Sequence, residues 1–168
     1  MPVHAGDVME VEVIHESGVY TLSLEAWISA PAPKVHHLLT DYMHLERVNP
    51  AVKKSEIIHS SSPVHHRVRT LIEACVAFFC KQLMQVWDVE QQYDNVIVAT
   101  IVPELSNFRS GKANWALRKE NGGTRLCFTT QLEPSFWVPP LIGPWLIRYK
   151  LRSEAVESVE NLERLGSP

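Results

Sequence analysis

The stretch Arg148–Leu165, RYKLRSEAVESVENLERL, decides the fold class, because its helical period sets it apart from the alternating runs that precede it. Its apolar residues recur at i, i+4, i+8 and i+11 and form one stripe: Leu151, Ala155, Val159 and Leu162. Its acidic residues step by three along another side: Glu154, Glu157, Glu160 and Glu163. A helix over this range would be about 27 Å long at about 1.5 Å per residue. The sequence therefore predicts a long amphipathic helix near its carboxyl end.

Ahead of this helix, alternating apolar and polar runs predict a series of strands: Val52–His59, Val64–Phe79, Leu83–Glu90, Asn95–Val102, Phe108–Arg118 and Thr124–Glu133. The separators SSSP, QQYDN, PELSN and ENGGT are rich in turn residues. ENGGT lies between two alternating runs and predicts a hairpin. Strands joined by such short links must be antiparallel.

The first part of the chain changes period once. VEVIHESGVYTLSLEAWIS, residues 11–29, alternates on both sides of Glu16-Ser17-Gly18 and predicts two strands and a turn. In residues 30–50, Pro33 can open a helix that carries Val35, Leu38 and Leu39 on one face, and a second short helical turn follows before Asn49-Pro50. We expect an α+β fold: a curved antiparallel sheet of about six or seven strands around the long helix, with two short helices after the first strand.

Composition limits the function classes. A chain of 168 residues with 45% apolar residues fits a single domain over 1–168. A net charge of −3 argues against nucleic acid as a partner, because nucleic acid binding normally needs a basic face. The opening residues lack the pattern of a secretory signal, and the cysteine count of three is odd, so we expect a cytoplasmic protein. Within one extended strand Cys75 and Cys80 would lie about 17 Å apart, which is too far for a disulfide.

A twisted sheet around one helix seldom closes completely, and an apolar space left between them is a place for a small molecule. The element order, with three stretches, resembles the START-like superfamily (SRPBCC, polyketide cyclase and lipid-transport proteins), nearest to its coenzyme Q-binding START branch. The stretches are residues 28–58, ISAPAPKVHHLLTDYMHLERVNPAVKKSEII, residues 121–134, NGGTRLCFTTQLEP, and residues 138–163, VPPLIGPWLIRYKLRSEAVESVENLE. The resemblance covers about Val8 to Leu165 and implies the helix-grip fold.

The resemblance also implies a cavity between sheet and helix that takes lipids, isoprenoid quinones or polyketides. Strand alternation puts Arg109, Gly111, Ala113, Trp115 and Leu117 on one face. The ligand-binding residues expected on this basis are Arg109, Trp115, Leu126, Phe128, Thr130, Phe136, Trp145 and Tyr149. For each of them ordinary core packing is the alternative.

FWVPPLIGPWLI, Phe136–Ile147, contains no charged residue. Twelve residues of helix would span about 18 Å, too short for a hydrocarbon layer of about 30 Å, and three prolines would interrupt the helix. Two interpretations remain open. The stretch is a core plug, or it is a gate that touches a membrane surface, where its tryptophans and the cations Arg148, Lys150 and Arg152 would suit the headgroup zone.

Few residues suggest chemistry. Arg109 would offer donors to a ligand carbonyl or carboxylate, and Glu104 would become a general acid if both side chains faced inward; Glu73, Asp88 and Glu104 are expected on the solvent face. His37, Asp41 and His44 have the spacing of a metal-binding helix face, but an exposed face explains them as well. The sequence has no GxSxG, HExxH or glycine-rich phosphate loop. We expect no catalytic residue, no cofactor and no metal.

Three functions are compatible with these features. The first is a non-catalytic binding or transport protein for a lipid, an isoprenoid quinone or a similar molecule. The second is an enzyme of the polyketide-cyclase type, which would need at least two convergent titratable residues in the cavity. The third is a protein-interaction module of the ribosome-associated START-like kind. We favour the first.

Overall fold

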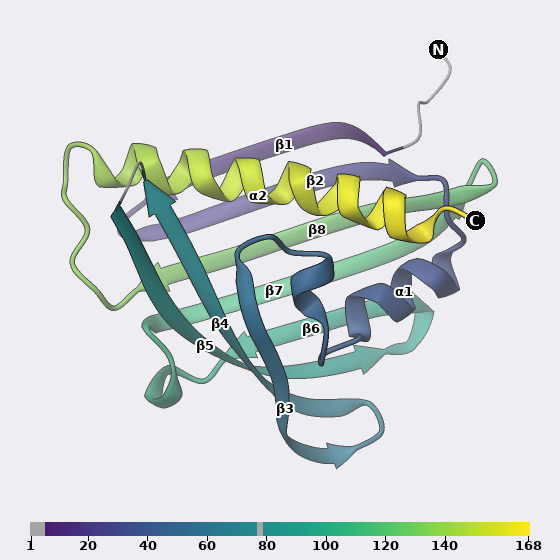
Figure 1. Ribbon diagram of the computed structural model, residues 1–168, viewed down its shortest axis with the longest axis horizontal. Coiled ribbons are helices and arrows are strands. Elements are labelled where there is room, and N and C mark those ends of the chain that lie inside the picture. The colour runs from purple at the N-terminus through teal and green to yellow at the C-terminus, as the bar shows by residue number, and fades with distance from the viewer. Residues whose placement is uncertain (1–5, 77–78) are drawn as a thin grey trace.

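The computed structural model describes residues 6–76 and 79–168, and within them an eight-stranded antiparallel sheet has the order β1-β2-β8-β7-β6-β5-β4-β3 (Figure 1). The strands are β1 Asp7–Glu16, β2 Val19–Ile28, β3 Val52–Ser62, β4 His65–Val76, β5 Phe79–Gln92, β6 Val96–Ile101, β7 Phe108–Glu120 and β8 Gly123–Pro134. Strands that are neighbours in the sheet are also consecutive in the chain, except that β2 pairs with β8. β1 forms one edge of the sheet and pairs with β2. The expected fold class is confirmed, with one strand more than the expected upper number.

Two hairpin turns have positive φ at both of their central residues. Ser17 and Gly18 have φ values of 51° and 82°, and Asn121 and Gly122 have 49° and 79°. Positive φ at both central residues is what two-residue hairpin turns require, and Asn and Gly adopt it at low cost. Both predicted turns are therefore confirmed.

The helices lie on one side of the sheet. The short helix α1, Ala32–Thr40, and the 3₁₀ turn η1, Leu45–Arg47, follow β2 rather than the first strand. Two further 3₁₀ turns are η2, Tyr93–Asn95, and η3, Pro103–Leu105. The long helix α2, Gly143–Gly166, runs across the concave side of the sheet (Figure 1). It begins five residues before the predicted start, because Pro144 in its first turn is compatible with a helix beginning.

The carboxyl-terminal half of α2 packs into the core. Val159 and Leu162 are fully buried there, and Leu162 belongs to a core cluster with Val35 of α1, Leu117 of β7 and Leu126 of β8. At the end of the helix, a Cβ atom on Gly166 would lie 2.5 Å from Ala30 Cβ, so the backbone approaches the end of β2 as closely as it can. α2 is therefore held at its carboxyl end.

Two sequence predictions are wrong because the strands are less regular than alternation assumes. The strand expected from Val64 to Phe79 ends earlier, at Val76, and the strand expected from Leu83 begins earlier, at Phe79; residues 77 and 78 between them lie outside the described residues. Cys75 and Cys80 are therefore cross-strand partners with Cα atoms 4.0 Å apart, and they form a disulfide. Disulfides persist in oxidising surroundings, so this pair removes the cysteine argument for a reducing compartment.

The second error concerns Arg109. The register of β7 against β8 shifts between Phe108 and Ser110, as at a β-bulge, and alternation restarts after it. Phe108 is consequently buried, whereas the Arg109 side chain is 69% exposed and pairs with Glu133 at 3.3 Å. The expectation that Arg109 shares the inner face with Trp115 is therefore wrong.

Candidate ligand-binding site

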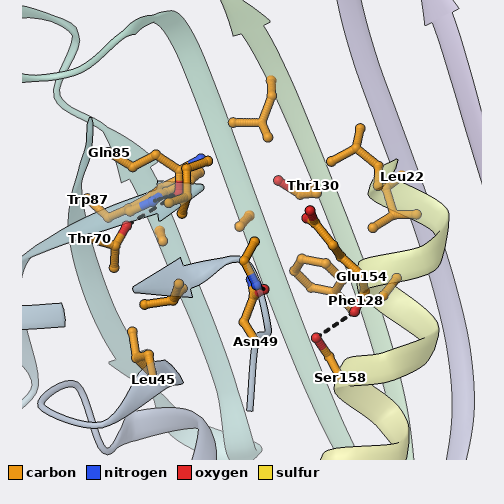
Figure 2. A pocket seen from close by; sticks show the side chains of 18 of the residues that line it. Leu22, Leu45, Asn49, Thr70, Gln85, Trp87, Phe128, Thr130, Glu154 and Ser158 are labelled. Carbon is orange, nitrogen blue, oxygen red and sulfur yellow. Dashed lines mark hydrogen bonds between the residues drawn. The ribbon is translucent and has the colours of Figure 1, made fainter. Parts of the chain in front are cut away.

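A cavity of about 380 Å³ lies between α2 and the inner face of the sheet. Its lining is mostly apolar and comes from nearly every strand, from η1 and from α2 (Figure 2). Volumes of about 300 to 1,000 Å³ are usual for small-molecule sites. All four residues of the helix stripe that the sequence predicts line this space: Leu151, Ala155, Val159 and Leu162.

Five of the predicted ligand-binding residues line this cavity: Trp115, Leu126, Phe128, Thr130 and Phe136. The Trp115 and Phe128 rings stack with centroids 4.8 Å apart and an interplanar angle of 27°. Phe136 packs edge-on against Phe108, with centroids 6.0 Å apart, and Lys81 Nζ lies 4.2 Å from the Phe136 ring centroid. These rings make one wall and one end of the cavity.

Arg109, Trp145 and Tyr149, the three other predicted residues, do not line it. Trp145 and Tyr149 stack on each other on the outer side of α2, where they are 58% and 59% exposed. The inner side of this helix turn is instead formed by Leu146, Ile147, Lys150 and Leu151. The expectation that Trp145 and Tyr149 face the cavity is therefore wrong, because they lie off the stripe of α2 that contains Leu151 and Ala155.

Sequence reasoning missed Glu154, which lines the cavity from the middle of α2. Figure 2 shows its carboxyl group pointing away from the helix, toward Thr130 of β8. Within residues 6–76 and 79–168 this carboxyl group has no hydrogen-bond or ion-pair partner. Burial among apolar side chains raises the pKa of Glu154 to about 7, with a small lowering by Lys150 and a small raising by Glu157. One signal was available: Glu154 follows Leu151 by three residues and so lies beside the apolar stripe.

Two hydroxyl groups near Glu154 have their protons already engaged. Ser158 Oγ donates to the Glu154 carbonyl oxygen at 2.7 Å, and Thr130 Oγ1 donates to the Lys112 carbonyl oxygen at 3.0 Å. Both side chains line the cavity, and Figure 2 shows them on either side of the Glu154 carboxyl group. A hydroxyl oxygen that has donated its proton still offers lone pairs. This part of the wall therefore presents hydrogen-bond acceptors.

A second polar group lies on the opposite wall, on β4 and β5 (Figure 2). Gln85 Oε1 accepts from Thr70 Oγ1 at 3.4 Å and from Trp87 Nε1 at 3.3 Å. The Gln85 amide NH₂ has no further partner in the described part of the chain, so it remains able to donate. Deeper in, Tyr42 OH accepts from Gln91 Nε2 at 3.2 Å, and burial raises the pKa of Tyr42.

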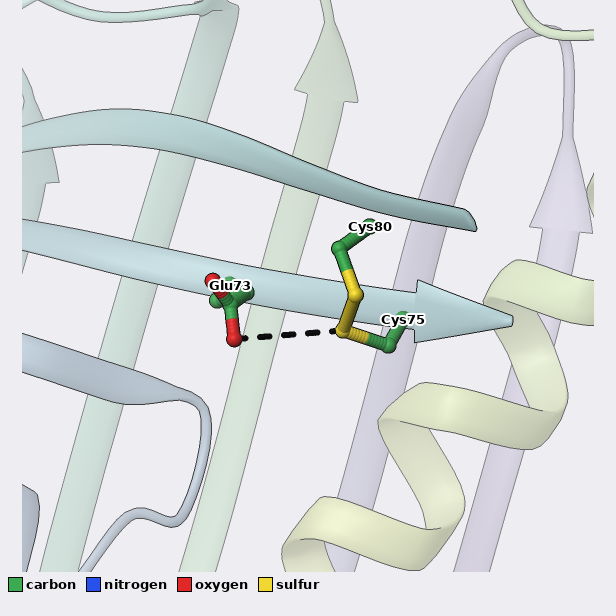
Figure 3. A group of neighbouring side chains, drawn as sticks. All are labelled: Glu73, Cys75 and Cys80. Atoms are coloured by element: carbon green, nitrogen blue, oxygen red, sulfur yellow. Dashed lines mark hydrogen bonds between the residues drawn. A yellow bond between two sulfur atoms is a disulfide. The ribbon is translucent and has the colours of Figure 1, made fainter. Parts of the chain in front are cut away.

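Side chains that could hold a metal ion gather at one place within the described residues, at the open end of β4 and β5 (Figure 3). This group consists of Glu73, Cys75 and Cys80, but both sulfur atoms are joined in the disulfide and offer no thiolate. The alternative metal face predicted from His37, Asp41 and His44 is not assembled: His44 Nδ1 pairs with Asp41 at 2.9 Å, and His37 does not join them. Glu73 lines the cavity, contrary to the expected solvent position, and lies 3.8 Å from Lys53 Nζ.

The apolar stretch Phe136–Ile147 is mostly at the surface. The exposed patch, as we call it, consists of Trp137, Leu141, Ile142, Trp145 and Tyr149, with exposed fractions between 58% and 92%. Phe136 alone among its aromatic residues packs inward as a plug would. No helix among the described residues is long and apolar enough to cross a membrane.

Comparison with known proteins agrees with this geometry. No protein-family model matches the sequence, and no curated protein matches it significantly. Solved structures do match. A STAR-related lipid transfer protein from Xanthomonas axonopodis is 15% identical, with 94% of this chain and 99% of the other covered and a TM-score of 0.69. The Zhui aromatase/cyclase from Streptomyces sp. R1128 is 14% identical, with 87% and 92% covered and a TM-score of 0.72. Human STARD10 is 9% identical, with 92% and 72% covered and a TM-score of 0.66.

The chain therefore has the START-like, helix-grip fold, and the predicted resemblance is confirmed at that level. A lipid transfer protein and an aromatase/cyclase both have this fold, so the fold alone does not assign a function to this chain.

Proposed function

We propose that this protein binds a hydrophobic or amphipathic small molecule in the cavity between α2 and the sheet. One observation carries the proposal: a space of about 380 Å³ is lined almost throughout by apolar side chains, in a fold that otherwise packs tightly. Water finds few hydrogen-bond partners in such a space, whereas an apolar ligand makes van der Waals contacts with the side chains that line it. Within this class of ligand we propose a lipid or an isoprenoid quinone, held for transport.

The test is identification of what the purified protein holds. Native mass spectrometry after gentle purification, with organic extraction and analysis of the extract, should reveal a bound hydrophobic molecule. The variant Ala113→Phe should lose it, since Ala113 is buried on the inner face of β7 and lines the cavity. Ala116→Phe on the same strand is the matched control, because Ala116 does not line the cavity. Equal ligand content in both variants would contradict the proposal.

A second candidate function, an enzyme of the polyketide-cyclase type, is favoured by one observation. Glu154 faces the cavity with a pKa of about 7, which suits a general acid or base at neutral pH. The extracted molecule distinguishes the two functions. A binding protein returns it chemically unchanged after incubation, whereas an enzyme converts it and the variant Glu154→Gln does not.

We also propose that the exposed patch contacts a membrane surface while the ligand enters or leaves. The patch adjoins Arg148 and Arg152, which are exposed on α2, so apolar and cationic groups lie together as headgroups require. Vesicles containing anionic lipid should shift the tryptophan fluorescence, and Trp145→Gln should weaken binding to them. Tyr93→Gln is the matched control, because Tyr93 is 95% exposed in η2, outside the patch. Equal vesicle binding by both variants would refute the contact.

A further inference from the structure

Three polar side chains of the cavity wall beside α2 offer hydrogen-bond acceptors and no donors. Glu154, Ser158 and Thr130 form what we call the acceptor cluster (Figure 2). The Ser158 and Thr130 protons are directed to backbone carbonyl oxygens, and the Glu154 carboxyl group has no partner in the described part of the chain. A carboxylate and two hydroxyl oxygens in this state accept hydrogen bonds and donate none.

We propose that the acceptor cluster binds the polar end of the ligand and that this end is a hydrogen-bond donor, an alcohol or phenol hydroxyl or a protonated amine. The inference rests on the proposed binding function and narrows its ligand class. The rest of the ligand would lie along Phe128, Trp115 and the apolar strands, which line the same cavity. A donor at the cluster would satisfy a partly buried carboxylate that has no protein partner in the described part of the chain.

An acceptor head would be bound less well at this position. An ester or ketone oxygen would meet lone pairs on Ser158 and Thr130, and a carboxylate would add like-charge repulsion from Glu154. Lys150, one helical turn earlier on α2, also lines the cavity and is the cation that a carboxylate head would choose instead. The position of the head along α2 therefore depends on its chemistry, and Lys150 and Glu154 select opposite ligands.

Protonation of Glu154 changes its hydrogen-bonding role. The charged groups that act on it from its own helix are Lys150 and Glu157. The titratable groups that line the cavity from other elements are Tyr20 of β2, Tyr42 before η1, Glu73 of β4 and Lys81 of β5. Because the pKa of Glu154 is about 7, the acceptor form dominates only above neutral pH. Affinity for a hydroxyl head should consequently rise as the pH increases through about 7.

The experiment compares ligands that differ only in the head. Saturated chains of equal length carrying an amine, an alcohol, a methyl ester or a carboxylate compete with Nile red, a neutral fluorophore that reports on the apolar cavity. At about pH 8 the amine and the alcohol should bind at least about 10-fold more tightly than the ester, as expected for a hydrogen bond to a charged group. In Glu154→Gln this preference should shrink to less than about 3-fold, with the affinity for Nile red unchanged. Glu157→Gln, an exposed position on α2, is the matched control and should keep the preference.

Each outcome decides between the proposals. Equal binding of all four heads, or a preference for donors that survives in Glu154→Gln, overturns the acceptor cluster as the recognition element and leaves hydrophobic binding intact. Tightest binding of the carboxylate overturns it too and points to Lys150. If neither Nile red nor any of the four chains enters the cavity, the proposed binding function itself fails.

Discussion

The two halves of α2 have the same sequence pattern and opposite surroundings. In the carboxyl-terminal half, Val159 and Leu162 are 0% and 1% exposed, and Gly166 touches the end of β2. In the amino-terminal half, Trp145 and Tyr149 are more than half exposed on the outer side, while Leu151 and Glu154 cover the cavity on the inner side. Both halves line the cavity, since Val159 and Leu162 also belong to its wall, but the side chains of the carboxyl-terminal half are packed into core clusters at the same time.

The difference follows from what lies opposite each half. α1 and the ends of β7 and β8 meet the carboxyl-terminal half, and their apolar side chains fill the space (Figure 1). The amino-terminal half faces the open end of the curved sheet, where no second helix lies (Figure 1). A helix stripe therefore shows which side is turned inward, but the neighbouring elements decide whether that side packs or lines a space.

The largest effect that separates the two halves should come from removing one leucine from each. Leu162→Ala leaves a hole in a packed core and should lower the free energy of unfolding by about 2 to 5 kcal/mol. Leu151 lines the cavity as Leu162 does, but it is only partly buried, so Leu151→Ala removes less buried apolar surface and should cost less than half as much. Chemical denaturation of both variants measures this. Equal losses would show that the amino-terminal half is packed as tightly as the other.

Much of the architecture was accessible from the sequence because it depends on periods and turns. The 3.6 period identified α2, strand alternation identified β2, β6 and β8, and Ser17-Gly18 and Asn121-Gly122 marked their turns through backbone conformations that few residues adopt. Inner positions on β8, such as Phe128 and Thr130, followed directly, since β8 has no register shift along its pairing with β2. These predictions needed no knowledge of the tertiary structure.

The wrong predictions lie where a local irregularity in a strand changes which face the following side chains occupy or which residues they pair with. A register shift after Phe108 turns Arg109 outward, and the antiparallel pairing of β4 with β5 puts Cys75 opposite Cys80. Neither event has a strong sequence signal, because no glycine marks the bulge and no Gly, Pro or Asn occupies residues 75–80. Glu154 was missed for another reason: four glutamates at a spacing of three suggest one side of the helix, but each step of three falls about 60° short of a full turn, so Glu154 lies beside the apolar stripe and lines the cavity.

The next effect is electrostatic and compares two of these glutamates. Because the pKa of Glu154 is raised from its ordinary 4.5 to about 7, the folded protein binds the proton more tightly than the unfolded chain. Protonated Glu154 therefore does not destabilise the folded protein below about pH 4.5, and the free energy of unfolding falls as the pH rises from about 4.5 to about 7. Glu154→Gln, neutral at every pH, should raise the free energy of unfolding by on the order of 2 to 3 kcal/mol at about pH 8, allowing for partial exposure, and by less than about 1 kcal/mol at pH 5.

Glu163, in the packed half, is the control for this pH dependence. Its carboxylate accepts hydrogen bonds from the Ser29 backbone N–H, at 2.8 Å, and from the Ser29 hydroxyl. Glu163→Gln should therefore destabilise the protein by about 1 to 2 kcal/mol, opposite in sign to Glu154→Gln. Denaturation curves for both variants across this pH range test the pair. A Glu154→Gln variant with the same stability gain at pH 5 and pH 8 would mean that Glu154 is not buried as a titrating group.

The smallest effect on stability is expected on the outer side of the amino-terminal half. Trp145 contacts Tyr149 across the helix surface, with ring centroids 6.0 Å apart, and Trp145→Gln should change the free energy of unfolding by less than about 0.5 kcal/mol. Phe136→Ala, in contrast, removes a ring that packs against Phe108 and Lys81 and should cost at least about 1 kcal/mol. Thermal denaturation of the two variants, beside their binding to anionic vesicles, separates the roles of the two aromatic residues. A large loss of stability in Trp145→Gln would mean that the exposed patch is part of the folded core. The proposed membrane contact would then lose its physical basis, because only a ring that the fold does not need can move from water into lipid.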